Sequence, residues 1–267
     1  MVATADWRVV VMATSASSTI EDEGLPPEII DRLIAMTEPG EHVNDELRQR
    51  IASQKDIAQA YLWLLNLRAN PIVSKSMIQS VHRKMFQRTQ KDIAGSYKAR
   101  QVVIRWHKPD GTIERVPTLP PEKVGDYLGS LCDETSAVFS REPFGNLLAA
   151  AEFSCDFLAI HPFSDGNGRL ARMLCGYLLQ QADYHLIGEY PLEQIILETR
   201  HRYYDALNHS QSFWHRENEN LEPWIKYFIE ILSEHCRRAK RAKETRQEQI
   251  SQGKTPFTFP NAPISPL

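Results

Sequence analysis

Residues 146–160 predict a helix that is apolar on nearly every side. The segment, NLLAAAEFSCDFLAI, contains neither glycine nor proline. Its apolar positions include Leu147, Leu148, Ala151, Cys155 and Leu158. A helix that is hydrophobic all round must be covered by protein, because a surface helix keeps a polar face. We therefore expect this helix at the centre of the fold, with the other elements packed around it.

The rest of the chain shows mainly helical periodicity. Further helices are expected at residues 45–67, 74–88, from 120 onward, 169–182, 192–208 and 222–243. The spacing changes only at residues 102–106 and 112–116, which flank the turn Pro109-Asp110-Gly111 and predict a small β-hairpin. The expected fold class is therefore mainly α, a helical bundle with one small β-hairpin.

The helical pattern predicts one folded domain over residues 41–243, and no internal repeat divides it. Residues 1–40 form a separate N-terminal segment in this scheme. Residues 244–267 are rich in Gln, Pro and Ser, a composition that predicts a disordered tail.

Composition narrows the choice of partners and compartment. Lys and Arg number 31 and Asp and Glu 34, a formal charge of −3, which argues against a nucleic-acid partner because nucleic-acid binding normally needs a basic excess. No apolar run approaches the roughly 18–20 residues that span a membrane. The four cysteines form no CxxC pair, which predicts buried thiols in a reducing compartment: Cys132, Cys155, Cys175 and Cys236. We expect a soluble cytoplasmic protein.

A polar loop separates two of the predicted helices. Residues 161–172 read HPFSDGNGRLAR and combine an imidazole, a carboxylate, two glycines, an amide and two guanidinium groups. A simple connection between helices needs only a turn residue and a cap, so this many polar groups indicate a functional site. The alternative is a plain turn before a capped helix, with solvated arginines and His161 as a helix-end residue.

The glycines and arginines of this loop suit a polyphosphate. Gly166 and Gly168 can adopt left-handed backbone angles, which lets successive N–H groups point into one concavity. That concavity faces the start of the next helix, where unpaired N–H groups and the helix dipole favour an anion. Arg169 and Arg172 are three residues apart, so both side chains reach the same neighbourhood.

Two other loop residues add metal and acid–base chemistry. Asp165 is a candidate ligand for Mg²⁺, a hard cation that takes one or two carboxylates together with phosphate oxygens. His161 is a candidate general base, because the ordinary pKa of an imidazole lies near neutrality. The loop therefore predicts a magnesium-dependent polyphosphate site with a base beside it.

The loop resembles the signature of the Fic family, HPFx(D/E)GNGRxxR, at every specified position. Ala94–Tyr97 is similar to the family's lead into its target-binding flap, and Arg202–Leu207 resembles the helix after its loop. The similarity extends over about residues 10–240. It implies a protein adenylyltransferase, which moves AMP from ATP to a Ser, Thr or Tyr hydroxyl of a protein, itself included. Gly168 favours AMP transfer, because relatives that phosphorylate carry lysine there.

The resemblance implies a role for each loop residue. His161 would take the proton from the attacking hydroxyl, and Asp165 would hold Mg²⁺ between the α- and β-phosphates. The residues that would bind the phosphates are Gly166, Asn167, Gly168, Arg169 and Arg172. Of these, Arg169 would contact the β-phosphate and Arg172 the γ-phosphate.

Two other regions gain roles by resemblance. The hairpin would be a flap that binds a target segment by strand pairing, a mode that reads backbone groups. Its candidate residues are Val102, Val103, Ile104, Thr112 and Ile113. Tyr203 or Tyr204 would line the adenine pocket. The alternative for the hairpin is a structural element at the edge of the fold without a binding role. The alternative for the two tyrosines is a place in the hydrophobic core.

The acidic segment SSTIEDEG at residues 17–24 predicts either a helix start or an internal brake. A Ser or Thr cap followed by acidic residues is typical of a helix N-terminus. The resemblance implies instead an inhibitory helix of pattern (S/T)xxxE(G/N), whose glutamate pairs with the second arginine of the loop. Thr19 with Glu23 and Gly24 satisfies this pattern in full, whereas the register of Ser17 and Glu21 matches the wording Ser-Ser-x-Ile-Glu but has Asp22 where glycine is expected. We favour Glu21, because Ile20 before it matches the related sequences, and Glu23 stays open.

The resemblance implies ATP as substrate, Mg²⁺ as cofactor and a protein target as partner. Whether the chain forms a homodimer stays open. A brake in the same chain would need no separate inhibitor protein. Two rival functions use the same residues: removal of AMP with the N-terminal glutamate orienting water, or a non-catalytic ATP-binding scaffold. The complete set His161, Asp165, Asn167, Arg169 and Arg172 argues against a scaffold.

Overall fold

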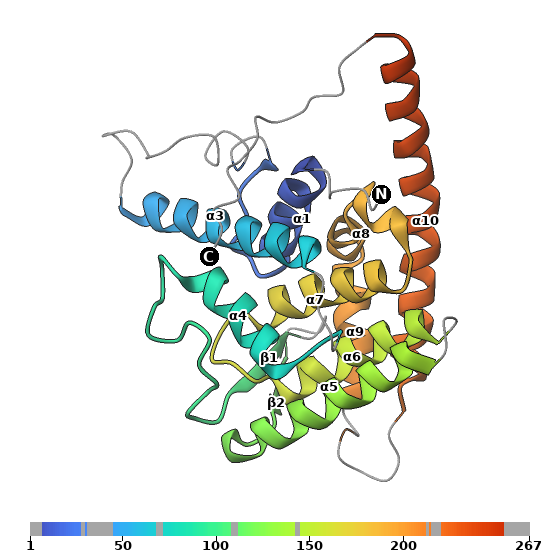
Figure 1. Cartoon of the computed structure of the whole chain (residues 1–267). Coiled ribbons are helices and arrows are strands. Elements are labelled where there is room, and N and C mark those ends of the chain that lie inside the picture. Colours follow the sequence, from blue (N-terminus) through green and yellow to red (C-terminus); the bar gives the residue numbers. More distant parts are fainter. Residues whose placement is uncertain are drawn as a thin grey trace.

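The computed structural model describes residues 7–27, 30, 45–67, 72–107, 112–141, 145–211, 214 and 220–253. Within them the fold is mainly helical with one β-hairpin, as predicted (Figure 1). The helices are α1 (Trp7–Ile20), α3 (Asp45–Asn66), α4 (Lys75–Phe86), α5 (Val124–Arg141), α6 (Asn146–Ile160), α7 (Asn167–Gln181), α8 (Leu192–Glu198), α9 (Arg200–Gln211) and α10 (Glu222–Ser251). The strands are β1 (Val103–His107) and β2 (Ile113–Pro117).

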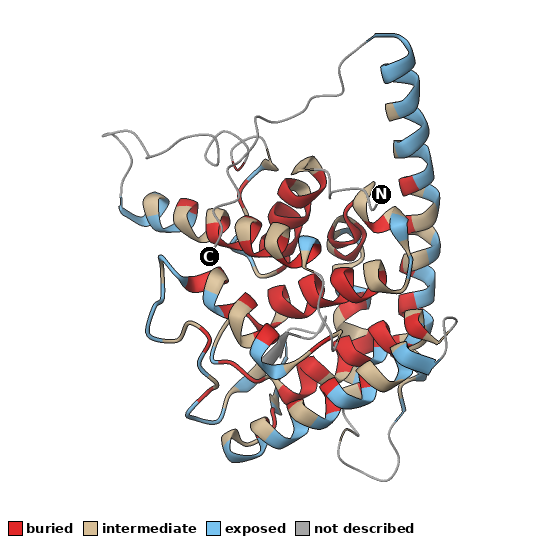
Figure 2. Ribbon diagram, in the orientation of Figure 1, coloured by how far each residue is buried: buried red, intermediate tan, exposed pale blue. Residues whose placement is uncertain are grey.

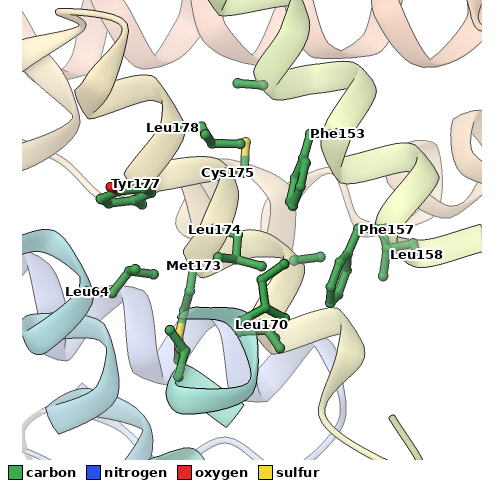
Figure 3. Close-up of a cluster of buried hydrophobic side chains, with 14 of the residues drawn as sticks. Leu64, Phe153, Phe157, Leu158, Leu170, Met173, Leu174, Cys175, Tyr177 and Leu178 are labelled. Atoms are coloured by element: carbon green, nitrogen blue, oxygen red, sulfur yellow. The ribbon is translucent and has the colours of Figure 1, made fainter. Parts of the chain in front are cut away.

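Helices α6 and α7 form the centre of the fold, which confirms the prediction from the apolar segment. Helix α6 contacts α5, α7 and α10, and α7 also contacts α3. Buried residues gather on these two helices and on the faces turned toward them (Figure 2). Figure 3 shows the side chains that fill the interface between them, among them Phe153, Phe157, Leu170 and Leu174, all fully buried.

The segment expected as one helix at residues 192–208 is two helices, α8 and α9. The break falls at Thr199, whose side chain accounts for it. Its hydroxyl Oγ1 donates to the carbonyl of Ile195 at 2.7 Å and also lies 2.9 Å from the hydroxyl of Tyr227 on α10. A hydroxyl that hydrogen-bonds one turn back bends a helix. The contact with α10 is tertiary, so periodicity alone could not reveal this break.

Helix α10 continues beyond residue 243, where we expected a disordered tail to begin. It runs to Ser251, and its last turns extend away from the rest of the molecule (Figure 1). Good helix formers (Glu, Arg and Gln) fill these turns, and Gly253, with φ of 69°, follows the end. Arg246 also pairs with Glu189 at 2.6 Å. The remainder of the predicted tail lies outside the described residues.

The hairpin confirms the predicted β-structure, shifted by one residue. Strands β1 and β2 are antiparallel, with Val103 opposite Pro117 and His107 opposite Ile113. Among the described residues no third strand pairs with them. Val103 and Ile113 expose 44% and 54% of their surface. The hairpin therefore presents open edges, as a strand-pairing flap requires, and its turn lies outside the described residues.

The serines and threonine before the acidic residues end a helix and do not start one. Helix α1 covers residues 7–20, and Glu21 and Asp22 form the turn that follows. Helix α1 packs against α3 and α8. Val10, Ala13 and Ile20 of its buried face are fully inaccessible. Interpreting the acidic residues as the start of a helix is therefore wrong, because the apolar residues that need a helical face come before them.

The cysteines and the helices agree with the predictions from composition. Cys132, Cys155 and Cys175 are buried, Cys236 is half-buried, and none of the four is in a disulfide. Among the described residues, no helix combines the length and the apolar character that crossing a bilayer needs.

Candidate active site

The loop between α6 and α7 begins with a sharp backbone turn at His161. Its φ of 50° and ψ of 62° are left-handed, a conformation that few residues other than glycine adopt. Pro162 follows, and a proline disfavours the α-helical conformation in the residue before it. Helix α6 therefore ends at this point, and the loop turns back toward the start of α7.

Internal contacts hold the loop in one conformation. The Asn167 side chain accepts from the backbone N–H of Phe163 at 3.0 Å and donates to its carbonyl at 2.8 Å. The Phe163 ring is fully buried and stacks on the imidazole of His82 at 3.8 Å between centroids. The Asn167 side chain is thus used in shaping the loop, and only its backbone is left for an anion.

His82 of α4 is a site residue that the sequence reasoning missed. Its Nδ1 accepts from the N–H of Gly95 at 2.9 Å, so the proton belongs on Nε2, which lies 3.1 Å from the carbonyl of Asp165. Burial lowers the pKa of His82 to about 4. A neutral imidazole satisfies both contacts, whereas protonation would turn Nδ1 into a second donor facing Gly95.

We expect His82 to make the chain less stable in mild acid. The unfolded imidazole takes up a proton below its ordinary pKa near 6.5, whereas the folded one resists until about 4. Stability is therefore full above about pH 6.5 and falls toward pH 4, by about 2 kcal/mol at pH 5. Urea unfolding of wild type and His82→Gln at pH 7 and pH 5 measures how much of the loss of stability at pH 5 comes from His82. An equal loss of unfolding free energy in wild type and His82→Gln would contradict this role of His82. The control is His201→Gln, at an exposed position.

Helix α7 begins with open backbone N–H groups. Gly166 precedes it with φ of 77°, and no side chain caps this end. A Cβ at position 166 would lie 2.6 Å from the ring of Phe86, so only glycine fits. The first N–H groups of a helix have no partner within it and attract anions. The start of α7 therefore has the backbone geometry that an anion site needs, and anion binding there stays a prediction.

Asp165 lies at the edge of this helix start and is 42% exposed. Its Oδ1 accepts from the N–H of Gly166 at 2.5 Å and from Arg169 at 3.3 Å, and its Oδ2 lies 3.4 Å from Gln90 Nε2. No cluster of three His, Cys, Asp or Glu able to hold a metal occurs among the described residues. One accessible carboxylate fits Mg²⁺ that takes its other ligands from phosphates and water.

Both loop arginines are buried and paired with the N-terminal segment. The side chains of Arg169 and Arg172 are each 3% exposed. Burial acts to lower the pKa of Arg172, but the adjacent Glu21 carboxylate outweighs it and the net pKa is raised. Burying a guanidinium requires a partner, because an unpaired charge is costly to desolvate. In this structure the partners are protein carboxylates.

Glu21 lies against both Arg172 and the start of α7. Its Oε1 accepts from Arg172 Nη2 at 2.8 Å. Ser17 completes the contacts of this guanidinium, with its hydroxyl and its carbonyl each 2.9 Å away. A Cβ at position 168 would lie 2.3 Å from the same Oε1. The carboxylate therefore lies at the start of α7, the place that the sequence predicts for a phosphate.

The two residues after Glu21 also pair with arginines. Asp22 binds Arg200 of α9 through two hydrogen bonds of 2.9 and 3.0 Å. Glu23 binds Arg169 at 2.6 Å. Glu21 and Glu23 thus each contact one of the two loop arginines, and which of them inhibits stays a prediction. Only Glu21 contacts the second arginine of the loop, as the favoured register requires.

The imidazole of His161 is held with one nitrogen free of backbone contacts. Its Nδ1 lies 3.3 Å from the carbonyl of Leu158, which assigns the proton to Nδ1 and leaves Nε2 as an acceptor. Burial lowers the pKa of His161 to about 4, and the charge of Lys98 acts in the same direction. The imidazole is therefore neutral at physiological pH, as a base must be.

The structure brings most, but not all, of the predicted site residues together. Tyr204 lies beside the site, with its hydroxyl 3.4 Å from the carbonyl of Ile20. Tyr203 is buried against Trp224, at 5.7 Å between ring centroids. The cavity that Tyr203 lines has room for about one water molecule, far too little for a nucleobase. The adenine role of either tyrosine stays a prediction, as does the flap role of the hairpin.

Comparison with known families agrees with the loop. Residues 72–179 match the model of the Fic/DOC family. The chain is 27% identical over 154 residues to "Protein adenylyltransferase Fic" of Nematostella vectensis, covering 56% of this chain and 30% of that protein. It is 30% identical over 152 residues to the protein of the same name in Culex quinquefasciatus, covering 57% and 27%. The matched region is thus less than a third of each of these longer relatives.

Solved structures show the same fold. A Fic family protein from Desulfovibrio desulfuricans G20 superposes with a TM-score of 0.72 at 21% identity, covering 88% of this chain and 66% of that one. A fragment of Fic-1 from Caenorhabditis elegans gives a TM-score of 0.60 at 22% identity, covering 92% and 64%. At these identities the likeness concerns the fold, which is the predicted Fic-like helical bundle.

Proposed function

Because this chain carries a Fic/DOC domain and is distantly related to protein adenylyltransferases, we propose that it transfers AMP from ATP to a protein hydroxyl. We also propose that residues 21–23 hold it in an inhibited state. The observation that carries both parts is the start of α7, where open N–H groups lie beside two buried arginines and each arginine is paired with a glutamate of the N-terminal segment. Such a site suits a triphosphate once those carboxylates leave.

The transfer needs a base and a charged cradle. Nε2 of His161 accepts the proton of the target hydroxyl while its oxygen bonds to the α-phosphorus. The bond from that phosphorus to the bridging oxygen breaks, and pyrophosphate leaves. The arginines and the N–H groups of α7 stabilise the charge on the leaving group, which is how most phosphoryl transfer is catalysed.

Mg²⁺ would be held by Asp165 together with phosphate oxygens, and would supply further charge neutralisation. The exposed carboxylate supports this role, because it has free surface beside the anion site. The open edges of the hairpin support strand pairing with an extended target segment. Such pairing reads the backbone, so the identity of the target protein does not follow from it.

Inhibition follows from competition for Arg172. While Glu21 holds this guanidinium, the γ-phosphate has no partner there, and ATP can bind only in an unproductive position. Glu23 does the same at Arg169, where the β-phosphate would bind. Asp22 contacts neither loop arginine, so its pair with Arg200 serves to fix the segment in place.

Labelled nucleotides test the proposed activity. Purified Glu21→Gly protein is incubated in a cell lysate with ATP labelled at the α- or at the γ-phosphate, and with α-labelled UTP and CTP. We expect protein-bound label from α-labelled ATP alone, with the modified hydroxyl identified by mass spectrometry. Label from γ-labelled ATP would mean phosphorylation. No label from any nucleotide would remove the proposal.

Glu23→Gly should raise self-modification less than Glu21→Gly does. The Glu23 side chain is 52% exposed, and an ion pair with so much solvent contributes about 0.2–1 kcal/mol. We expect a rise of at most about fivefold for Glu23→Gly, measured as label incorporated from α-labelled ATP. A larger release from Glu23→Gly than from Glu21→Gly would make Glu23 the main brake. Asp183→Gly, at an exposed acidic position with positive φ, controls for lost charge.

Removal of AMP by the same site is the second candidate function. The Glu21 carboxylate lies against the start of α7. In this alternative it would orient a water molecule there for attack on the AMP group of a modified target. Wild type and Glu21→Gly are each given a pre-modified target, and this function requires AMP release by wild type only.

A further inference from the structure

Lys98 is a buried lysine that the mechanism above does not use. It lies between α4 and β1 and is 3% exposed. Its Nζ donates to the carbonyl of Ile160 at 3.0 Å and to Oγ1 of Thr118 at 2.8 Å. Lysine is rarely buried so completely, because its ammonium is strongly hydrated and its burial is costly. The cost of burying the Lys98 ammonium indicates that it has a specific role at this position.

The contacts of Lys98 bracket His161 on both sides. The side chain holds the carbonyl of Ile160, the residue before His161, and the backbone N–H holds the carbonyl of Pro162 at 2.9 Å, the residue after it. His161 itself has left-handed backbone angles that need support from its surroundings. Lys98 thus holds the peptide group that enters His161 and the one that leaves Pro162, so the turn is fixed at both ends.

The same lysine connects the end of α6, next to His161, to the base of the hairpin. Thr118, which accepts from Nζ, donates through its hydroxyl to the carbonyl of Val102 at 2.8 Å. These two residues adjoin β2 and β1, so Lys98 joins the two ends of the hairpin to the end of α6. The element expected to bind the target and the residue expected to take its proton share one anchor.

We infer that Lys98 is a positioning residue for His161. Lys98 fixes the left-handed turn at His161, and its positive charge adds to burial in keeping the imidazole neutral. The inference rests on the proposed function only where it calls His161 the base. The other charged groups that act on His161 are Glu21 from the N-terminal segment and Asp165 from the loop, and both favour protonation. Lys98 is the cation that opposes them, and at neutral pH it is charged, since burial lowers its pKa only to about 8.

The test follows protonation of His161 by NMR in the nucleotide-free chain, so it needs no catalytic activity. We expect wild type to resist protonation until about pH 4. Lys98→Met removes the charge, and the pKa of His161 should rise toward its ordinary 6.5, by at least half a unit. Lys98→Arg keeps the charge and should leave the pKa near that of wild type. Lys75→Met removes an exposed ammonium elsewhere and should change nothing.

An unchanged pKa of His161 in folded Lys98→Met would overturn the inference. If this variant does not fold, Lys98→Gln takes its place, because its neutral amide keeps two donors for the same acceptors. In the Glu21→Gly background, the acid limb of the rate of AMP transfer should move upward by the same amount as the NMR titration. A missing AMP transfer with a raised pKa would remove the proposed activity and leave the role of Lys98 intact.

Discussion

Glu21→Gly should raise self-modification about tenfold to a hundredfold. The Glu21 carboxylate, itself part-buried, holds the buried Arg172 through a charge-assisted hydrogen bond. Hydrogen bonds to charged groups contribute about 1.5–3 kcal/mol, and each 1.4 kcal/mol corresponds to about a factor of ten. Removing the carboxylate frees both the guanidinium and the start of α7 for phosphates. The measurement is the initial rate of label incorporation from α-labelled ATP.

Two matched variants make this result specific. Glu21→Gln keeps the size of the side chain and removes its charge, so it should release activity by a comparable factor. Asp22→Asn alters only the pair with Arg200 and should have a small effect, because Asp22 is 78% exposed. If Glu21→Gly, Glu23→Gly and the double variant all label no faster than wild type, residues 21–23 are not a brake.

His161→Ala should reduce AMP transfer by about two to four orders of magnitude, the usual contribution of a general base. The loss is best measured in the Glu21→Gly background, where the starting rate is high enough to follow. The phosphates are expected to bind at the start of α7, so calorimetry should still detect ATP binding to this variant. Loss of rate with retained binding would place the effect in the chemical step.

The control for His161→Ala is His201→Ala, at a histidine that is 61% exposed on α9. It should label at the rate of its parent and unfold at the same temperature. A His161→Ala protein that keeps its rate within a few-fold of the parent would exclude the imidazole as the base. Loss of both folding and activity would be resolved by His161→Gln, which preserves more of the packing.

Periodicity predicted the helices wherever a single buried stripe decides their extent. Helix α6 has the predicted bounds, and α3 and α4 differ from them by one or two residues at the ends. The failures have tertiary causes. Thr199 divides α8 from α9 through a hydroxyl that also contacts Tyr227, and nothing local in the sequence announces that contact. The last turns of α10 follow local helix propensity, which the polar composition obscured.

The loop residues could be found from the sequence, whereas their support could not. His82 lies four residues from both Ile78 and Phe86, so a polar residue within an apolar stripe was the available signal. Lys98 follows Tyr97 in a segment without periodicity, and only the folded contacts reveal its burial. Ser17 was visible as part of the acidic motif, but its two bonds to Arg172 depend on where α1 docks.

Because Glu21 belongs to the same chain as the site, the proposed brake would be a tethered ligand. The local concentration of this carboxylate at Arg172 is set by how α1 docks on α3 and α8, not by how much protein is present. Dilution would therefore leave the proposed inhibition unchanged, in contrast to inhibition by a separate protein, which dissociates. Any event that detaches α1 would lower this local concentration sharply, so detachment would be the step through which a cell controls the proposed activity.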